Sequence, residues 1–431
     1  MKKFWTFAIL IWTADSYALT LEECIQQALA QNRLLQAGKS RVDAQKSKAG
    51  QARAAFYPTL GLSATYTRLG NTPGAVIPAM PPLFPAEREI TTGFEDNYLA
   101  RLSANAPLFT WGKIAQPYRI EKERVVAESL KLAQSEEEIK LATTELFWSA
   151  LALGKNLEVR KKSAESLERH LKTVENKLAV GQATNFEQLR AQVELSNARV
   201  PITEAEAQLK TLYDRLGILL GLESGDTLAL EGELEFEPTG INLDEVTLQA
   251  KSNRPELKSL AVEKQVLRRA QALAGAENRP SLSLFSNVEY KNPFNARQVW
   301  KLDWNAGAGI TFPLFSGFHS HYKVQEIENQ KKALDLTVKE TEAQIEQEVR
   351  QAYYELGVAL ENSVALKANI ALAQKALEIA KVQYEAGVIT NLEELDAELS
   401  ALSAQTAYFA AVSNYLIAKA RLEKAIGQKI E

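Results

Sequence analysis

Cysteine and histidine are scarce in this chain, and their scarcity limits its chemistry. The 431 residues include one cysteine, Cys24, and three histidines. One cysteine excludes a disulfide framework and a cysteine-based metal site. His319 and His321 have a spacing that suits a metal, but they lack a third ligand nearby, so we interpret them as surface residues. Together with His170 they leave little for histidine-centred catalysis, and we expect no enzyme, metal or cofactor.

Proline, glycine and excess charge of one sign are also scarce. With 14 prolines and 21 glycines to interrupt 431 residues, the secondary-structure elements must be long. Lys and Arg total 50 against 54 Asp and Glu, a net charge of −4 that argues against a nucleic-acid binder. No apolar run reaches the roughly 20 residues that a membrane-spanning helix needs.

The N-terminus has the features of a secretory signal. Two lysines precede an apolar run at residues 4–12, and Ser16 and Ala18 supply the small side chains of a cleavage site. We therefore predict a signal peptide over residues 1–18 and export of the chain. A short anchor helix is the alternative, but nine residues are too few to cross a bilayer. Cys24 lacks the small preceding residues of a lipoprotein signal, so we expect it to be buried in a helix.

An internal duplication organises the rest of the chain. Pro107-Leu108-Phe109 recurs 206 residues later as Pro313-Leu314-Phe315. Nearer the start of each half the offset is 222, as between Leu21 and Leu243. We predict a first repeat over residues 19–221, a linker over 222–240 and a second repeat over 241–431.

Between these landmarks the composition and spacing predict long helices. Apolar residues seven apart, typical of a coiled-coil seam, are Leu395, Leu402, Phe409 and Leu416. Gly181 and Gly387, 206 residues apart, should each end a long helix, and Thr184 and Thr390 can cap the helices that follow. Each repeat should therefore contain one helical hairpin.

Four segments instead alternate apolar and polar residues. They lie at about 59–68, 99–107, 281–290 and 300–312. Each has the length of a tilted transmembrane β-strand, although a half-buried strand of a soluble sheet would look similar. Prolines should mark the four helix–strand junctions, at positions 58, 107, 280 and 313. The proline-rich segment 71–97 should be an irregular loop on the side opposite the helices.

Four strands cannot close a barrel, and an open sheet edge is not tolerated in lipid. Two chains would supply eight strands, a barrel filled by its own side chains, whereas three supply twelve and leave a lumen. The polar face is mostly Gly, Ser, Thr and Asn, which favours the open lumen of a trimer. The predicted fold class is thus mainly α with a membrane β-barrel.

With these features the sequence resembles the TolC family of outer-membrane efflux and secretion channels. The resemblance covers essentially the whole mature chain, and its most specific segments are LTLEECIQQAL at 19–29, YEAGVITNLEELDA at 384–397 and AKARLEKAIG at 418–427. It implies a homotrimer in which a 12-stranded barrel in the outer membrane continues into an α-helical barrel across the periplasm. It also implies a passive exit duct of a tripartite efflux pump or type I secretion system.

The resemblance extends to the helical tips. Glu393 and Asp396 match the acidic pair that rings the periplasmic constriction in this family. Tyr384 matches its tip tyrosine and Glu187 an acidic partner, which implies a Tyr384–Glu187 hydrogen bond that holds the hairpins closed. The alternative is that Glu393 and Asp396 are two solvent-exposed carboxylates near the start of a helix, without a role in a gate. Ile389 departs from the family pattern, because the founding member has arginine there.

The resemblance also implies partners. A periplasmic adaptor, joined to an inner-membrane pump or exporter, would seat on the tips around four residues: Gly181, Thr184, Gly387 and Thr390. Two other classes of protein are alternatives to the duct. A periplasmic adaptor or structural coiled-coil protein would share the signal peptide and hairpins but not two strand pairs in duplicate. A periplasmic enzyme has no catalytic residues to support it. The exported substrate and the cognate pump stay open.

Overall fold

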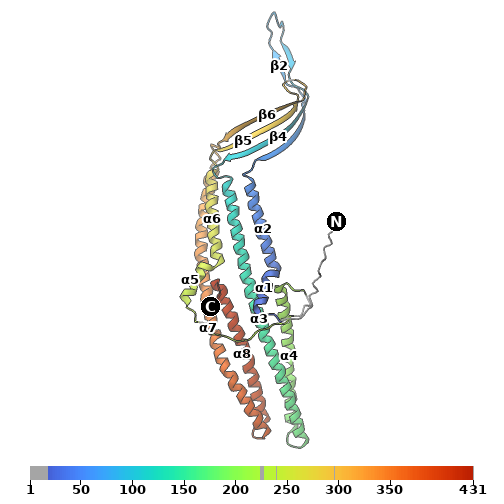
Figure 1. Cartoon of the computed structure of the whole chain (residues 1–431), viewed down its shortest axis with the longest axis vertical. Coiled ribbons are helices and arrows are strands. Elements are labelled where there is room, and N and C mark those ends of the chain that lie inside the picture. Colours follow the sequence, from blue (N-terminus) through green and yellow to red (C-terminus); the bar gives the residue numbers. More distant parts are fainter. Residues whose placement is uncertain (1–17, 224–227, 239, 296, 431) are drawn as a thin grey trace, which may run out of the picture. The chain divides into compact units, whose positions relative to one another are not determined.

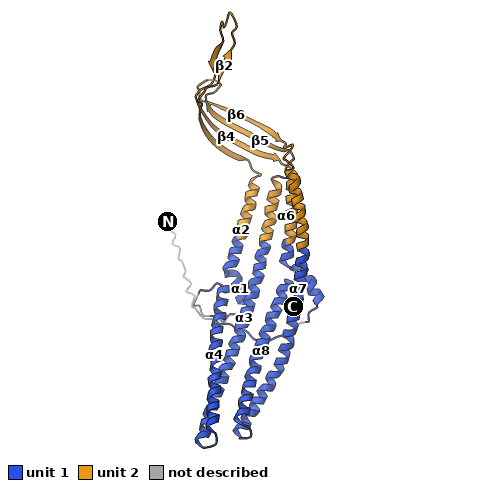
Figure 2. Cartoon of the chain, turned by 180° about the vertical axis from the view of Figure 1, so that it is seen from behind, with its two compact units in different colours: residues 1–40, 129–259, 338–431 blue, residues 41–128, 260–337 orange. Residues whose placement is uncertain are grey.

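The computed structural model describes residues 18–223, 228–238, 240–295 and 297–430. The predicted signal peptide therefore lies outside the described residues except for Ala18. Two compact units divide the chain, residues 1–40, 129–259 and 338–431 in one and residues 41–128 and 260–337 in the other (Figure 2). Each unit contains parts of both predicted repeats, because four of the helices run from one unit into the other.

With two short strands between residues 74 and 91 set aside, the order helix–helix–strand–strand–helix–helix occurs twice along the chain (Figure 1). In the first half the elements are α1 (Leu21–Gln31), α2 (Arg33–Ala54), β1 (Thr59–Arg68), β4 (Asp96–Phe109), α3 (Ala115–Ala179) and α4 (Asn185–Leu220). In the second half they are α5 (Leu243–Asn253), α6 (Pro255–Ala276), β5 (Ser281–Asn292), β6 (Lys301–Thr311), α7 (His319–Glu385) and α8 (Asn391–Ile426).

The four long strands form one antiparallel sheet in the order β1-β4-β5-β6. One row across this sheet is apolar throughout: Leu62, Leu102, Val288 and Trp304. The next row, on the opposite face, is polar throughout: Ser63, Arg101, Glu289 and Asp303. Since successive side chains point to opposite faces, this register gathers most apolar residues of the four strands on one face, with Leu99 and Phe285 as exceptions on the polar face. The alternation in the sequence predicted these two faces correctly.

Two expectations about the strands were wrong. Pro107 is not a helix–strand junction, because β4 continues to Phe109 and the pairing with β5 shifts register between Pro107 and Phe109. The segment 71–97 is not wholly irregular, because β2 (Gly74–Ile77) and β3 (Arg88–Thr91) pair in it as an antiparallel hairpin. Its prolines at 78, 81, 82 and 85 fall between these strands, so they leave the paired backbone groups untouched.

The unit made of residues 1–40, 129–259 and 338–431 has two large apolar cores and a smaller cluster of Leu167, Leu195 and Leu395. One lies among α1, α2, α3, α4 and α8 and includes Cys24, Leu35, Phe147, Leu216 and Leu220. The second lies among α5, α7 and α8 and includes Val246, Val349, Tyr415, Leu422 and Ile426. Cys24 is fully buried as predicted, and its burial raises the pKa of the thiol to about 11. Within the described ranges, no helix combines the length and the apolar character needed to cross a membrane.

Candidate functional site

The first helical hairpin turns at Gly181 and restarts with a capping box. Gly181 has φ 77°, a left-handed conformation that glycine adopts without a steric penalty. Thr184 then caps α4, and its side chain accepts a hydrogen bond from the Glu187 backbone N–H. In return, Glu187 Oε2 accepts hydrogen bonds from the Thr184 backbone N–H at 2.6 Å and from its hydroxyl at 2.9 Å.

The second hairpin repeats this geometry. Gly387 has φ 70°, and Thr390 caps α8. Glu393 Oε2 accepts hydrogen bonds from the Thr390 backbone N–H at 2.7 Å and from its hydroxyl at 2.8 Å. The backbone hydrogen bond, followed by that from the hydroxyl, lowers the pKa of the Glu393 carboxyl. Asp396 is exposed one turn further along α8. Glu393 therefore caps a helix in addition to any role in a gate.

The glutamates of these boxes were singled out for charge alone, and their capping role was not foreseen. Thr-x-x-Glu, three residues apart at a helix start, is the pattern that would have revealed it. It occurs as Thr184-Asn-Phe-Glu187 and as Thr390-Asn-Leu-Glu393.

Tyr384 does not make the predicted hydrogen bond within the chain. Among the described residues, none joins Tyr384 to Glu187, whose carboxylate is held by the capping box. Instead, Lys177 Nζ lies 3.9 Å from the centre of the Tyr384 ring and donates to the Tyr384 carbonyl at 3.4 Å. Burial raises the pKa of Tyr384, and the negative charges of Glu394 and Glu187 raise it further.

A buried histidine joins the two hairpins beside Tyr384. His170 Nε2, on α3, lies 3.0 Å from Asn391 Oδ1, on α8. Nδ1 of the same ring lies 3.1 Å from Glu394 Oε2, one turn along α8. The side chains of His170 and Glu394 are 8% and 12% exposed. No role was predicted for His170, since nothing near it in the chain indicates these partners.

The polar contacts continue along α3 away from the turn. Lys381 Nζ, on α7, lies 3.1 Å from Glu398 Oε2, on α8, and donates to Ser166 Oγ, on α3, also at 3.1 Å. Ser166 in turn donates to Glu398 at 3.3 Å. We call the set of side chains that joins α3 to α7 and α8 the seam cluster: Ser166, His170, Lys177, Lys381, Tyr384, Asn391, Glu394 and Glu398.

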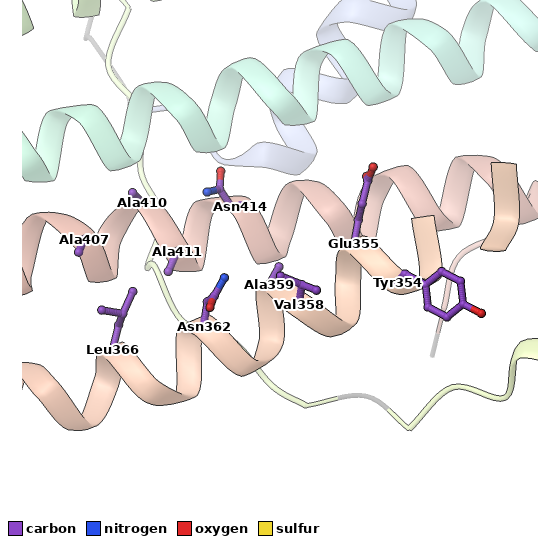
Figure 3. A pocket seen from close by; sticks show the side chains of 10 residues that line it. All are labelled: Tyr354, Glu355, Val358, Ala359, Asn362, Leu366, Ala407, Ala410, Ala411 and Asn414. Atoms are coloured by element: carbon purple, nitrogen blue, oxygen red, sulfur yellow. The ribbon is translucent and has the colours of Figure 1, made fainter. Parts of the chain in front are cut away.

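A groove lies between α7 and α8 (Figure 3). It is lined by Tyr354, Glu355, Val358, Ala359, Asn362, Leu366, Ala407, Ala410, Ala411 and Asn414. This lining is largely apolar and carries one carboxylate, so it does not have the paired acid and base of a catalytic site. Across the described part of the chain, no group of three His, Cys, Asp or Glu is placed to hold a metal.

The predicted surface histidines lie at the start of α7. His319 Nδ1 is 2.9 Å from Glu277 Oε2, and the imidazole is 66% exposed. His321 is exposed as well.

Comparison with known proteins finds a matching family model and relatives that align with most of the chain. The family model of the outer membrane efflux protein matches residues 24–222 and 246–428. The cobalt-zinc-cadmium resistance protein CzcC of Cupriavidus metallidurans is 24% identical over 374 residues, which cover 85% of this chain and 86% of the relative. The alkaline protease secretion protein AprF of Pseudomonas aeruginosa is 24% identical over 432 residues, which cover 97% of this chain and 87% of the relative.

Solved structures show the same fold. A crystal structure of CusC superposes with a TM-score of 0.76 at 18% identity, covering 95% of this chain and 92% of that one. The open-state MtrE outer membrane channel of Neisseria gonorrhoeae gives a TM-score of 0.75 at 18% identity, covering 95% and 89%. The chain therefore belongs to the outer membrane efflux protein family, and it is a passive exit duct of the outer membrane rather than an enzyme.

Proposed function

We propose that three copies of this chain form one duct that crosses the outer membrane and the periplasm. The observation that carries this proposal is the four-stranded sheet, whose edge strands β1 and β6 each leave one side unpaired in a single copy. Its apolar face is strongly exposed: Leu62 is 79%, Trp304 71% and Ile310 74% exposed. A sheet of this kind suits lipid only as part of a closed barrel, and twelve strands leave a lumen.

The helical tips support the same assembly. Exposed apolar side chains recur on α4 at coiled-coil spacing, at Phe186, Leu189, Val193 and Val200. On α8, Leu392 and Leu399 are exposed seven residues apart. Apolar stripes with no partner in their own chain are expected to pack against neighbouring copies. The helices of three chains would then form the wall of the periplasmic channel.

We further propose that the chain is processed and partnered as an exported duct. Residues 1–18 would be removed to leave a mature chain that starts at Leu19. A periplasmic adaptor would seat on the tips around Gly181, Thr184, Gly387 and Thr390, and an inner-membrane pump or exporter would supply the energy. CzcC and AprF, named for metal resistance and protease secretion, match at equal identity. The family assignment thus supports the duct and not a particular cargo.

The gate of this duct would lie at the second tip. Glu393 and Asp396 are exposed and lie three residues apart, so they share one face of α8. In a trimer they would place six carboxylates around the opening, a ring that favours cations over anions. Tyr384, held by Lys177 and His170, would anchor the hairpin behind this ring.

The gate is tested by removing its charge without removing the helix cap. Glu393→Gln keeps a side chain that can complete the capping box, and Asp396→Asn keeps the size of its side chain. In planar bilayers the double variant should lose cation selectivity and inhibition by multivalent cations. Glu187→Gln is the matched control in the first hairpin, and it should change both properties less. Unchanged selectivity and cation block in the double variant would remove these residues from the gate.

The trimer is tested separately by disulfide cross-linking between β1 and β6 in a Cys24→Ala background. A ladder of cross-linked species that ends at three chains is expected. A ladder that ends at two chains would refute the assembly.

A further inference from the structure

We propose that the pairing of β4 with β5 inside one chain is the template for the pairing of β6 with β1 of the next copy in the duct. In the resulting register, Ile310 lies opposite the partner's Ala64, and Gly309 lies opposite the partner's Thr65. This inference rests on the proposed trimer and deepens it, because it states which residues meet where two copies close the barrel. We call this contact the junction.

The two strand pairs of the chain have the same internal register. The first strands of the halves, β1 and β5, are related by the offset of 222 residues, and the second strands, β4 and β6, by the offset of 206. Leu60 pairs with Ala104, and the residues at these offsets, Leu282 and Ile310, also pair. The same holds for every residue pair between β1 and β4. The two offsets therefore identify structurally equivalent residues of the sheet.

The contact between the two strand pairs lies within the chain, where β4 pairs with β5. There, Ala104 is opposite Ser286. The residue equivalent to Ala104 in β6 is Ile310, and the residue equivalent to Ser286 in β1 is Ala64. Ile310 should therefore lie opposite the partner's Ala64, and each further pair of the junction follows from the same two offsets.

A closed barrel favours equal contacts all the way round. Strand tilt and stagger are linked in a barrel, so neighbouring strands must share one tilt. Three copies would supply six strand pairs of one register, joined alternately by β4–β5 contacts and by junctions. If the junction had another register, the tilt would have to change at every boundary between copies. The β4–β5 register at each junction avoids that change.

The two faces of the sheet restrict the junction to a few registers. Ile310 and Ala64 lie on the apolar face, whereas Gly309 and Thr65 lie on the polar face. A slip by one residue would place an apolar-face residue opposite a polar-face residue, which the pleat does not allow. A slip by two residues keeps both faces intact. The template therefore selects among registers that the faces alone leave open.

Side chains along the two edges fit the proposed register. Tyr66 of β1 contacts Tyr98 of β4, with ring centres 5.1 Å apart, and within the described part of the chain β1 has no strand on its other side. The register places the small side chain of a partner's Ala308 there, which leaves room for the ring. It also places Ala306 opposite Arg68, whose guanidinium is paired with a carboxylate of its own chain at 2.8 Å. Small residues of β6 thus meet the largest side chains of β1.

The turns that follow β4 and β6 support the equivalence. Trp111 and Gly112 have φ 52° and 90°, and the residues 206 positions later, Gly317 and Phe318, have φ 65° and 62°. Left-handed backbone is unfavourable for an aromatic residue, yet each turn contains one aromatic residue in this conformation. The same turn therefore follows both strands, so β6 leaves the sheet as β4 does, which the template requires.

Disulfide cross-linking of the full chain in a Cys24→Ala background tests the register. Ile310→Cys combined with Ala64→Cys should link the copies into a covalent trimer under mild oxidation. The slipped combinations, Ile310→Cys with Leu62→Cys or with Tyr66→Cys, should link about tenfold less. Diagonal neighbours on a sheet lie about 7–8 Å apart, and cysteines whose Cα atoms are more than about 7 Å apart are not bridged without backbone movement.

Ala104→Cys combined with Ser286→Cys is the matched control, because these residues form the equivalent pair inside one chain. Its loss of free thiols sets the yield expected of an aligned pair. Preferential linkage of either slipped combination would overturn the register and leave the trimer intact. Absence of linkage in all three combinations would also overturn it, provided that native mass spectrometry shows three chains. A mass of one or two chains for the unmodified protein would instead refute the proposed trimer, and the junction with it.

Discussion

The two halves of the chain use equivalent positions for one structural task but fill them with different side chains. Asn32, between α1 and α2, donates to the carbonyl of Leu219 near the end of α4, at 3.2 Å. Arg254, between α5 and α6, donates to the carbonyls of Lys424 and Ala425 near the end of α8, both at 3.3 Å. Each side chain donates to carbonyls in the last turn of a helix, where helices leave carbonyls short of partners, although the Lys424 carbonyl also accepts from the Gly427 backbone N–H.

The difference lies in what else these side chains hold. The amide of Asn32 also accepts hydrogen bonds from the first turn of α2. The guanidinium of Arg254 is only 5% exposed and pairs with Glu256 at 3.0 Å and with Glu348 at 2.8 Å. Burial works to raise the pKa of Glu348, but hydrogen bonds from Lys424 and Arg254 keep it below its ordinary value. The second half therefore secures its helices with buried charge where the first uses a neutral cap.

The hairpin tips diverge in the same way. Both carry the same capping box, but His170 and Lys177 of α3 correspond, at the offset of 206 residues, to Ala376 and Gln383 of α7. Tyr384 in turn corresponds to Leu178. The basic side chains of the seam cluster thus come largely from one half, and its acids and its tyrosine from the other. The two halves therefore share the hairpin and its capping box, whereas residues that differ between the halves make the contacts from one hairpin to the other.

The largest expected effect tests whether both halves face lipid alike. Ala100 and Ala306, 206 residues apart, lie on the apolar face of β4 and β6. Arginine at either position should cost about 2–4 kcal/mol per chain near the membrane midplane and block insertion. Assembly in outer-membrane fractions measures this. Asn305→Arg, on the polar face, should insert normally, and equal damage from all three substitutions would contradict the face assignment.

A smaller effect is expected from removing the side chains that bind the ends of α4 and α8, and its size should differ between Asn32 and Arg254. Arg254→Ala should lower the free energy of unfolding by about 3 kcal/mol, because it leaves Glu348 in a half-buried site with Lys424 alone and uncaps α8. Asn32→Ala should cost about 1 kcal/mol, the usual value of a neutral cap. Denaturant titration followed by far-ultraviolet circular dichroism measures both. Equal losses would mean that the buried charge adds nothing to the cap.

The smallest effect concerns the capping boxes, which we expect to be interchangeable. Thr184→Ala and Thr390→Ala should each destabilise the first turn of its helix by about 1 kcal/mol, because each removes the oxygen that accepts the N3 amide. Hydrogen exchange of α4 and α8 measures the fraying. A loss at one tip only would show that the seam cluster, rather than the cap, holds the other.

Acid should fray α8 in the same way. The pKa of Glu393 is lowered in the folded chain, so its contribution is present above its ordinary value of 4.5 and is lost as pH falls through the folded pKa. Exchange of the first turn of α8 should therefore rise below pH 4.5, and Glu393→Gln should not show this rise.

Most of the fold could be predicted because it follows from local patterns. The strands came within a few residues of their observed limits, since the alternation of apolar and polar side chains is a property of each segment alone. The hairpin turns were predicted from glycine and threonine at matched positions. The β2–β3 pair was missed because the prolines between its strands outweighed two short runs of β-branched residues.

The sequence by itself determined the duplication, the helices, the strands and the family, because each rests on periodicity, on capping residues or on segments that can be read in order. Only the tertiary structure decided the contacts of the tips. His170 and Asn391 are 221 positions apart, and Lys177 and Tyr384 are 207 apart. Partners at such separations are chosen by how whole helices pack, and neither residue carries a local sign of the other. For that reason the family resemblance predicted Glu187 as the hydrogen-bond partner of Tyr384, whereas in the folded chain Tyr384 packs against Lys177 and His170.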